Sequence, residues 1–244
     1  MKKISLLLCL LLSGIFLLAQ KAPSHQQWDK LLKKYVTTDG RVNYKSLQKD
    51  KASLDDYLKT LSNNAPQSSW SENEKKAYWI NAYNAFTISL VLQHYPVKSI
   101  KDIGGSIYKI NTAWDIKFIT IGGKKYDLNN IEHRILRKEF DDPRIHFAIV
   151  CASMSCPLLR NEAYTATELN VQLESAGKAF LNDKTKNSIT AGKAQLSKYF
   201  SWYKGDFIKK GTLIEFINKY SQIKLNENAK IDYLDYNWNL NEQQ

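Results

Sequence analysis

The run from Ser71 to Tyr95 constrains the fold of this chain more than any other feature. Ser71 and Glu74 have the spacing of a capping box, which begins a helix. After Lys76, no charged residue follows until the run ends at Tyr95. A helix that is apolar on nearly all sides has to be enclosed by protein. The sequence therefore predicts a globular domain built around this helix.

The composition supplies the material for such a core. Hydrophobic residues make up 43% of the 244 residues, and the chain holds 14 Tyr and 6 Trp, which is typical of a globular protein rather than a disordered one. No repeat and no Pro/Gly-rich linker divides the chain. We therefore expect an α+β fold, a mostly helical single domain over residues 21–244 with a small antiparallel sheet. Further helices are predicted over 25–36, 46–61, 165–181 and 213–220, and strands over 114–121, 145–150 and 230–239. Hairpin turns are predicted at Gly122-Gly123, after the first of these strands, and around Gly192, within a short hairpin over 188–197.

Residues 1–20 have the pattern of a signal peptide. Lys2 and Lys3 precede an apolar run from Ile4 to Ala19, a charged region followed by a hydrophobic one. The alternative is an N-terminal membrane anchor, but about 16 apolar residues are short for a span. We expect cleavage near residue 20, export to the periplasm or the medium, and no stable membrane span in the mature protein.

The formal net charge is +11, but the lysines are scattered and many stand beside acids, as in the run from Lys49 to Lys51. No Arg-rich stripe or RNA-binding motif appears, so we expect a solvated basic surface and no nucleic acid partner. An unknown peptide, glycan or protein is the expected partner, and the aromatic run from Tyr199 to Tyr203 is a candidate surface for it. No cofactor and no metal is expected, since Cys151 and Cys156 have neither further cysteines nor histidines at ligand spacing.

The stretch from Asp127 to Arg160 carries the candidate chemistry. It reads as a helix capped by Asp127, a break at Pro143, an apolar strand from Ile145 to Val150, and a loop of small residues from Cys151. Buried strand ends that open into such loops commonly display a reactive group. Cys151 is therefore a candidate nucleophile.

Spacing favours His133 over His146 as the partner of Cys151. His146 and Cys151 are five positions apart in the sequence. This spacing places them on opposite faces of a strand, or roughly 140° apart on a helix. His133 belongs to the preceding helix, which can fold back on the strand. We expect its imidazole within about 4 Å of the sulfur. Glu132 adjoins His133 in sequence but points about 100° away, which makes it a weak candidate for orienting the ring.

Asn81 and Asn84 are two amides one turn apart on the buried helix. An unpaired buried amide costs ~1–3 kcal/mol, so both need partners. The favoured interpretation is that each amide staples loop backbone. The alternative is that one orients His133 or donates to an oxyanion.

Three motifs add a family resemblance: WINAYNAFTISLVLQHYPVKSI, YDLNNIEHRILR and DPRIHFAIVCASMSCPLLRNEAYTA. In this order they resemble the domain of unknown function 547 family over about residues 72–183. The resemblance implies a fold similar to papain-like folds in permuted order, with histidine before cysteine. The positions that it carries over are Trp79, Asn81, Tyr83, Asn84, Glu132, His133, Cys151, Ser153 and Pro157.

Three functions compete. In the first, Cys151 is the nucleophile and His133 the base of a thiol enzyme that hydrolyses or transfers an acyl group. In the second, the protein is a non-catalytic binding or structural domain in which a Cys151–Cys156 disulfide tightens the loop. In the third, the same two sulfurs cycle in a redox role.

Overall fold

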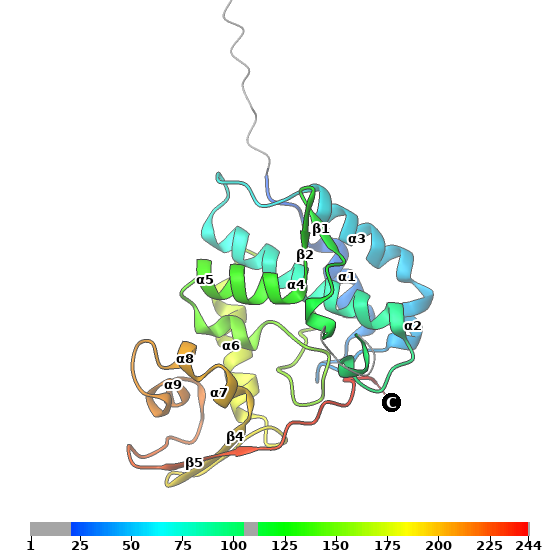
Figure 1. Ribbon diagram of the computed structural model, residues 1–244. Coiled ribbons are helices and arrows are strands. Elements are labelled where there is room, and N and C mark those ends of the chain that lie inside the picture. The colour runs from blue at the N-terminus through cyan, green and yellow to red at the C-terminus, as the bar shows by residue number, and fades with distance from the viewer. Residues whose placement is uncertain (1–20, 105–111, 244) are drawn as a thin grey trace, which may run out of the picture.

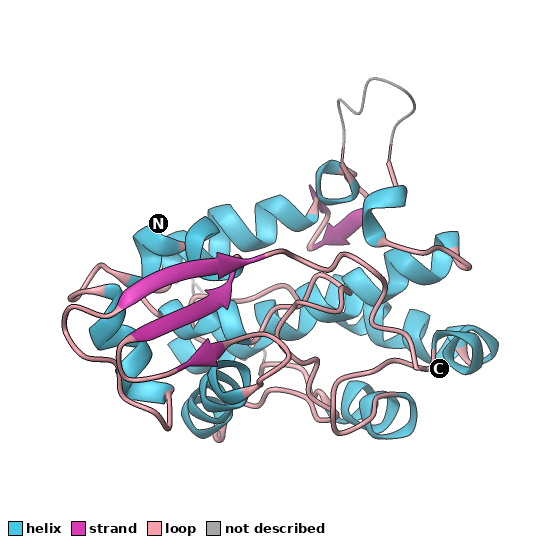
Figure 2. Cartoon of the chain, turned by 90° about the horizontal axis from the view of Figure 1, so that it is seen from below, coloured by secondary structure: helices cyan, strands magenta, loops and turns pink. Residues whose placement is uncertain are grey.

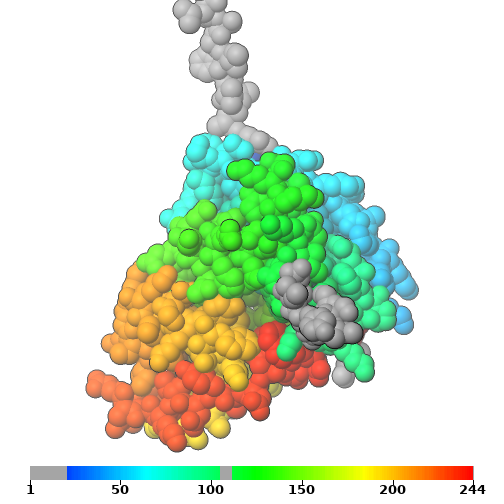
Figure 3. Space-filling model, in the orientation of Figure 1, coloured from blue at the N-terminus to red at the C-terminus, as the bar shows by residue number. Residues whose placement is uncertain are grey.

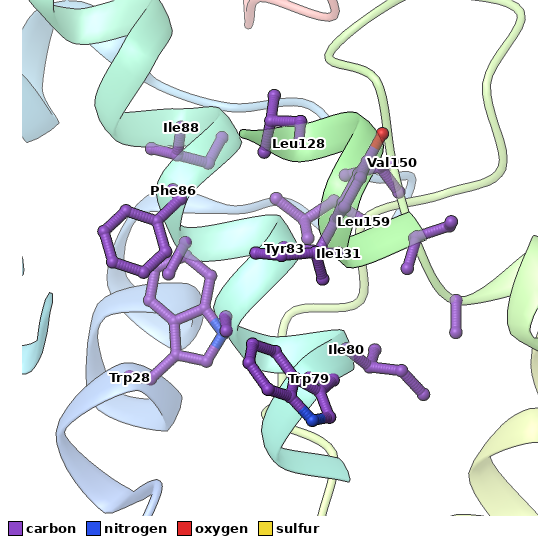
Figure 4. Close-up of a cluster of buried hydrophobic side chains, with 14 of the residues drawn as sticks. Trp28, Trp79, Ile80, Tyr83, Phe86, Ile88, Leu128, Ile131, Val150 and Leu159 are labelled. Carbon is purple, nitrogen blue, oxygen red and sulfur yellow. The ribbon is translucent and has the colours of Figure 1, made fainter. Parts of the chain in front are cut away.

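The computed structural model describes residues 21–104 and 112–243, with α4 (Glu72–His94) at the centre (Figure 1). The predicted capping box begins this helix, because the Ser71 side chain accepts from the Glu74 amide and the Glu74 carboxylate reaches back. Every residue from Lys76 to Leu92 is buried. Figure 4 shows Trp28 on one side of the helix and Leu128, Ile131 and Val150 on the other. The helix enclosed on nearly all sides is thus confirmed.

Three helices precede α4 in the chain: α1 (Gln26–Tyr35), α2 (Tyr44–Lys49) and α3 (Lys51–Asn63). Helix α3 packs against α4, and α1 packs against both α2 and α3. The single helix predicted over 46–61 is wrong, because the chain breaks between α2 and α3 at Asp50. The Asp50 carboxylate accepts from the Tyr35 hydroxyl at 2.8 Å and from the Ser53 hydroxyl at 2.5 Å. Side-chain contacts with α1 and α3 therefore hold the break.

A hairpin of β1 (Ile119–Ile121) and β2 (Lys124–Tyr126) packs near α3. Its turn is the predicted glycine pair, Gly122 and Gly123, with φ of +55° and +75°. The predicted strand began too early, because a 3-10 turn, η2 (Ala113–Asp115), occupies its first residues. Ile119 and Ile121 face the core, and Ile116 and Phe118, before the strand, are partly buried against it.

The stretch after the hairpin is helical almost throughout. It holds η3 (Asn130–Leu136), a π-helix, then α5 (Arg137–Glu139) and η4 (Pro143–Phe147), a 3-10 helix. The Asp127 carboxylate accepts from the Asn130 amide at 2.6 Å, as expected of a cap. The strand predicted over 145–150 is wrong: Asp142 caps a helical turn that Pro143 begins, and irregular backbone follows it.

The C-terminal half adds four helices and a second sheet, whose three strands lie side by side (Figure 2). Strands β3 and β4 form the predicted antiparallel hairpin, while β5 pairs with β4 in parallel, so this sheet is mixed. The α+β fold is confirmed, and the permuted papain-like order stays a prediction. The elements are α6 (Leu169–Asn182), β3 (Ser188–Ile189), β4 (Lys193–Ser197), α7 (Tyr199–Trp202), α8 (Lys204–Phe207), α9 (Leu213–Tyr220) and β5 (Lys230–Leu234).

Two clusters of buried side chains meet at η4. Ile145 belongs to the cluster around α4, whereas Phe147 belongs to a second, aromatic cluster with Phe180 and Phe200. The segment that leads to Cys151 is thus held between both. Within the ranges 21–104 and 112–243, no helix has the length and apolar character needed to cross a membrane.

After β5, residues 235–243 return across the molecule to α2 (Figure 1). Leu240 forms a β-bridge with Ser153, and Glu242 forms one with Val42. In the space-filling view, this red segment contacts both the yellow-orange and the green parts of the surface (Figure 3). The C-terminal residues therefore join the two halves of the molecule.

Candidate functional site

Asn84 fixes the backbone that leads to Cys151. Its amide nitrogen donates to the Ala148 carbonyl at 2.8 Å, and its oxygen accepts from the Val150 amide at 2.9 Å. Asn81 makes the same pair of bonds with the Tyr164 backbone, at 2.7 and 3.0 Å. Both asparagines therefore hydrogen-bond loop backbone, as the favoured interpretation predicted. Their hydrogen bonds do not go to His133.

The backbone turns sharply directly after Cys151. Ala152 has φ +56°, the left-handed region that residues other than glycine rarely occupy. Such a conformation costs of order 1–3 kcal/mol and persists only where the surroundings hold it. Here the C-terminal segment holds it, since the Asn241 amide donates to the Ala152 carbonyl at 3.1 Å and the Met154 amide to the Asn239 carbonyl at 2.8 Å.

Three side chains contact the Cys151 sulfur. Cys156 Sγ lies at 3.0 Å, Ser153 Oγ at 3.1 Å and the Tyr236 hydroxyl at 3.3 Å. Ser153 Oγ also donates to the Tyr236 oxygen at 3.0 Å. Each hydroxyl has one proton to give. The Ser153 proton therefore goes to Tyr236, and the Tyr236 proton is left to hydrogen-bond Cys151.

Both thiols are free in the structure, so the predicted Cys151–Cys156 disulfide is absent from it. The hydrogen bond from Cys156 lowers the pKa of Cys151, and those from Ser153 and Tyr236 add to the effect, against burial and the charge of Glu132. Burial raises the pKa of Cys156 well above its usual value. Cys151 is therefore the sulfur that ionises first, and Cys156 stays a protonated donor to it.

His133 is not arranged as the base that spacing predicted. Its Nδ1 lies 2.9 Å from the Arg137 guanidinium, which can only donate, so the proton of the imidazole is assigned to Nε2. The hydrogen bonds of Cys151 Sγ among the described residues go elsewhere, to Ser153, Cys156 and Tyr236. His133 and Cys151 do line the same pocket. They share a site without a direct hydrogen bond.

Glu132 is the buried carboxylate of the site, with 3% of its surface exposed. Its Oε2 accepts from the Tyr83 hydroxyl at 3.0 Å, and Tyr83 in turn accepts from the Trp114 indole at 3.3 Å. Oε1 lies 3.9 Å from His133 Nδ1, too far for a hydrogen bond. Glu132 therefore does not orient the imidazole, which agrees with the prediction that it is a weak candidate for that role.

Cys151 opens on a pocket of about 220 Å³ with aromatic walls. The Tyr236 and Trp238 rings lie 4.6 Å apart, and Trp202 stacks on Trp238 at 5.6 Å. Motif reasoning missed Tyr236 and Trp238 as site residues, although aromatic side chains at alternate positions were a usable signal. The aromatic lining consists of Tyr83, Trp114, Tyr199, Trp202, Tyr203, Tyr236 and Trp238.

His146 is buried among aromatic rings and does not hydrogen-bond Cys151. Its ring lies 4.1 Å from that of Tyr203, and its Nε2 is 2.8 Å from the Asp206 carboxylate. Burial lowers the pKa of His146. Asp206 also accepts from Arg137 at 2.6 Å, so this carboxylate links His146 to the guanidinium beside His133. His146 is structural, although not for the strand-based reason that the sequence suggested.

Comparison with known proteins identifies the region around this site. Residues 67–181 match the model of a family described as "Protein of unknown function, DUF547". No curated protein and no solved structure matches the chain. The matched region holds Glu132, His133 and Cys151, whereas Trp202, Tyr236 and the other C-terminal walls of the pocket lie beyond it. Within the described ranges, no group of three or more His, Cys, Asp or Glu is placed to hold a metal ion.

Proposed function

The chain carries a domain of the DUF547 family, and from that premise we propose that it is an exported thiol enzyme that hydrolyses or transfers an acyl group through Cys151. One observation carries the proposal. A half-buried thiol with a lowered pKa, in contact with Cys156, Ser153 and Tyr236 on a sharp turn, opens on a pocket large enough for a side chain or small ligand. This is the environment expected of a reactive cysteine rather than a structural one.

The reaction follows from the thiolate. The Cys151 sulfur attacks the carbonyl carbon of an amide or thioester, and a C–S bond forms. The bond to the leaving amine or thiol then breaks, and that group takes up a proton. Water, or a second amine, cleaves the C–S bond and releases the acid or the transferred acyl group.

The proposed roles differ from those of a Cys–His pair. Tyr236, supported by Ser153, holds the ionised sulfur by hydrogen bonding. His133 carries its proton on Nε2, so its proposed part is to donate to the oxygen or the leaving group of the substrate rather than to take the thiol proton. Because hydrogen bonds lower the pKa of Cys151, the proposal has the thiol lose its proton to solvent rather than to an imidazole.

Labelling with iodoacetamide, with the adduct located by mass spectrometry, tests the proposal. We expect Cys151 to be alkylated in the native protein, Cys151→Ser to abolish the native-state label, and Cys156→Ser to retain it. His133→Ala should leave alkylation near the wild-type rate, because the imidazole does not hydrogen-bond the sulfur. Native protein that is inert at Cys151, or labelled only after unfolding, contradicts the proposal.

A second candidate function is thiol redox chemistry, which the 3.0 Å separation of the sulfurs favours. Cys151 attacks a disulfide of a partner, and Cys156 then displaces the partner as a dithiol. The partner gains two electrons, and the two cysteines of this chain are oxidised to a disulfide. Equilibration with a small disulfide, followed by a thiol count, distinguishes this function: it requires a Cys151–Cys156 bond that forms and reduces reversibly.

Export completes the proposal. It is supported by Lys2, Lys3 and the apolar run from Ile4 to Ala19, which lie outside the described residues. We expect mature protein recovered from the periplasm or the medium to begin near residue 21, as read by N-terminal sequencing. Exported material that begins at Met1 contradicts it.

A further inference from the structure

The residues that line the pocket beside Cys151 include acidic groups but no basic side chain, although Lys101 and Arg137 lie over the rings of Trp238 and Tyr203 from outside it. Glu132 and the ionisable Cys151 are both among its lining residues, and none of the described residues that line it is Lys or Arg. His133 Nδ1 accepts from the Arg137 guanidinium, which is not among the residues that line the pocket. A ligand in this pocket therefore meets an anionic environment.

One oxygen of Glu132 has no hydrogen-bond partner. Tyr83 donates to Oε2, whereas Oε1 is buried and no donor reaches it with hydrogen-bond geometry, although the Tyr203 hydroxyl lies close enough to interact with the carboxylate. Buried carboxylate oxygens are almost always paired, and each exception calls for an explanation. The missing partner is an N–H or O–H donor, and a positively charged donor suits a carboxylate best.

The rings around the carboxylate suit a cation as well. The face of an aromatic ring carries partial negative charge and attracts ammonium groups, most strongly when water is excluded. Trp202, Trp238 and Tyr236 are packed with centroids 4.6 to 5.6 Å apart and form one side of the pocket. Their apolar surface also suits an alkyl chain that joins the ammonium to the rest of a substrate.

We propose that this pocket binds a primary ammonium group on an alkyl chain, with its N–H donating to Glu132 Oε1 and the aromatic walls enclosing the chain. Oε1 is buried, so a neighbouring side chain has to move before the ammonium can reach it. His133 is the side chain expected to move, because its Nδ1 lies 3.9 Å from Oε1 and its side chain is 41% exposed.

Such a ligand also acts on Cys151, a consequence that rests on the proposed function. The negative charge of Glu132 opposes ionisation of the sulfur, and a bound ammonium neutralises that charge. Binding is therefore expected to lower the pKa of Cys151 further, so that the substrate activates its own nucleophile. The other titratable groups that face the sulfur are Cys156, Tyr44, Tyr83, Tyr203 and Tyr236.

Calorimetric titration of the full-length mature protein with n-butylammonium chloride tests the site. The control ligand is 1-butanol, which has the same four-carbon alkyl group but no charge. We expect butylammonium to bind at least about tenfold more tightly than butanol, and Glu132→Gln to remove most of that difference. Glu139→Gln, on an exposed carboxylate outside the pocket, should bind like the wild type. Equal affinity for the two probes, or an unchanged affinity in Glu132→Gln, overturns the inference. The wild-type comparison decides alone if Glu132→Gln fails to fold.

The pH midpoint of Cys151 alkylation tests the coupling. With saturating butylammonium the midpoint should shift to lower pH, whereas in Glu132→Gln it should already be lowered and no longer respond. If butylammonium does not change the pH midpoint, the idea that the bound substrate lowers the pKa of Cys151 is overturned. Glu132-dependent binding to a protein whose Cys151 is inert supports the ammonium site and contradicts the proposed enzyme, so the two failures are distinguishable.

Discussion

The pKa of Cys151 is lowered by the thiol of Cys156 and by two hydroxyl groups, with no hydrogen bond from an imidazole. Ser153 and Tyr236 have two hydroxyl protons for three contacts, two with the sulfur and one with each other. Since Ser153 donates to Tyr236, one hydroxyl proton is left for the sulfur. Hydrogen bonds to an ionised group are worth more than those between neutral groups. A thiolate held in this way needs no cationic neighbour, which is compatible with Glu132 lying in the same pocket.

Replacement of Tyr236 by Phe should raise the pKa of Cys151. The change removes a donor that stabilises the thiolate and keeps the ring in the pocket wall, so the pH midpoint of alkylation moves up and the rate at neutral pH falls. The absorbance of the thiolate against pH gives an independent measurement. Tyr233→Phe, on exposed β5, is the matched control and should titrate like the wild type. An unchanged midpoint in Tyr236→Phe would show that the hydroxyl does not hold the sulfur.

At the residue scale, sequence reasoning could find Cys151 but not what surrounds it. Small neighbours and an apolar approach marked the cysteine, and one-turn spacing marked Asn81 and Asn84 as buried amides that need partners. The tautomer of His133 could not be predicted, because it depends on Arg137, which in turn is held by Asp206 from far along the chain. The left-handed Ala152 gave no signal either, since alanine ordinarily avoids that conformation.

At the element scale, strong local patterns predicted well and short apolar runs did not. The helix α4 followed from a capping box and a long uncharged run, and the β1–β2 turn followed from two glycines. The run from Ile145 to Val150 is apolar because it lies between two cores, and burial alone does not distinguish a strand from a 3-10 helix. The Asp142-Pro143 cap decided the outcome locally.

Phe86 tests the central position of α4. It is 5% exposed and contacts the ring of Phe118 edge to face. Phe86→Ala should lower the free energy of unfolding by ~3–5 kcal/mol, the usual range for a large-to-small change in a core. Urea denaturation measures it, with Val171→Ala on the exposed side of α6 as the control. A loss below about 1 kcal/mol would contradict the central placement of α4.

Asp142 ties α4 to η4 and makes stability depend on pH. Burial raises the pKa of Asp142, but hydrogen bonds and charge from Arg144 and Lys76 outweigh it and bring the pKa from 3.8 to about 2. A lowered carboxyl pKa stabilises the fold above pH 4, and this stabilisation is lost as pH falls towards 2.

Asp142→Asn should therefore cost about 2 kcal/mol near neutral pH, and its deficit relative to the wild type should shrink as pH falls from 4 towards 2. Chemical denaturation at a series of pH values measures it. Asp141→Asn, at the more exposed neighbouring carboxylate, should cost little at any pH. A deficit for Asp142→Asn that stays constant down to pH 2 would show that the native pKa is not lowered.

At the scale of the whole molecule, the site is shared between the family-matched region and residues beyond it. Residues 67–181 supply Cys151, Glu132 and His133, whereas α7 and residues 236–238 supply most of the aromatic wall. Sequence reasoning predicted the α+β fold and many of its elements but not this assembly. Contacts between residues far apart in the chain leave no periodic pattern to read.

Asn241 is the side chain that anchors the returning C-terminal segment. The Tyr44 hydroxyl donates to its oxygen at 2.8 Å, and its nitrogen donates to the Gly40 carbonyl at 3.1 Å. Asn241→Ala should lower the free energy of unfolding by about 1–3 kcal/mol, because it leaves buried Tyr44 without a partner. Hydrogen exchange should also rise at the backbone amides near 239–241. Exposed Asn228→Ala is the control, and unchanged exchange at 239–241 would contradict an anchoring role.

The contact between the C-terminal segment and Tyr44 also determines when the site can form during synthesis. Tyr44 and Asn241 are 197 positions apart, so the ribosome has produced nearly all of the protein before this bond can form. Until then Cys151 lacks Tyr236 above it and the bonds that hold Ala152 in its turn. If Cys151 acts as proposed, its thiol is therefore an ordinary one during most of synthesis. The hydrogen bonds that lower its pKa are complete only after residues 236–241 dock.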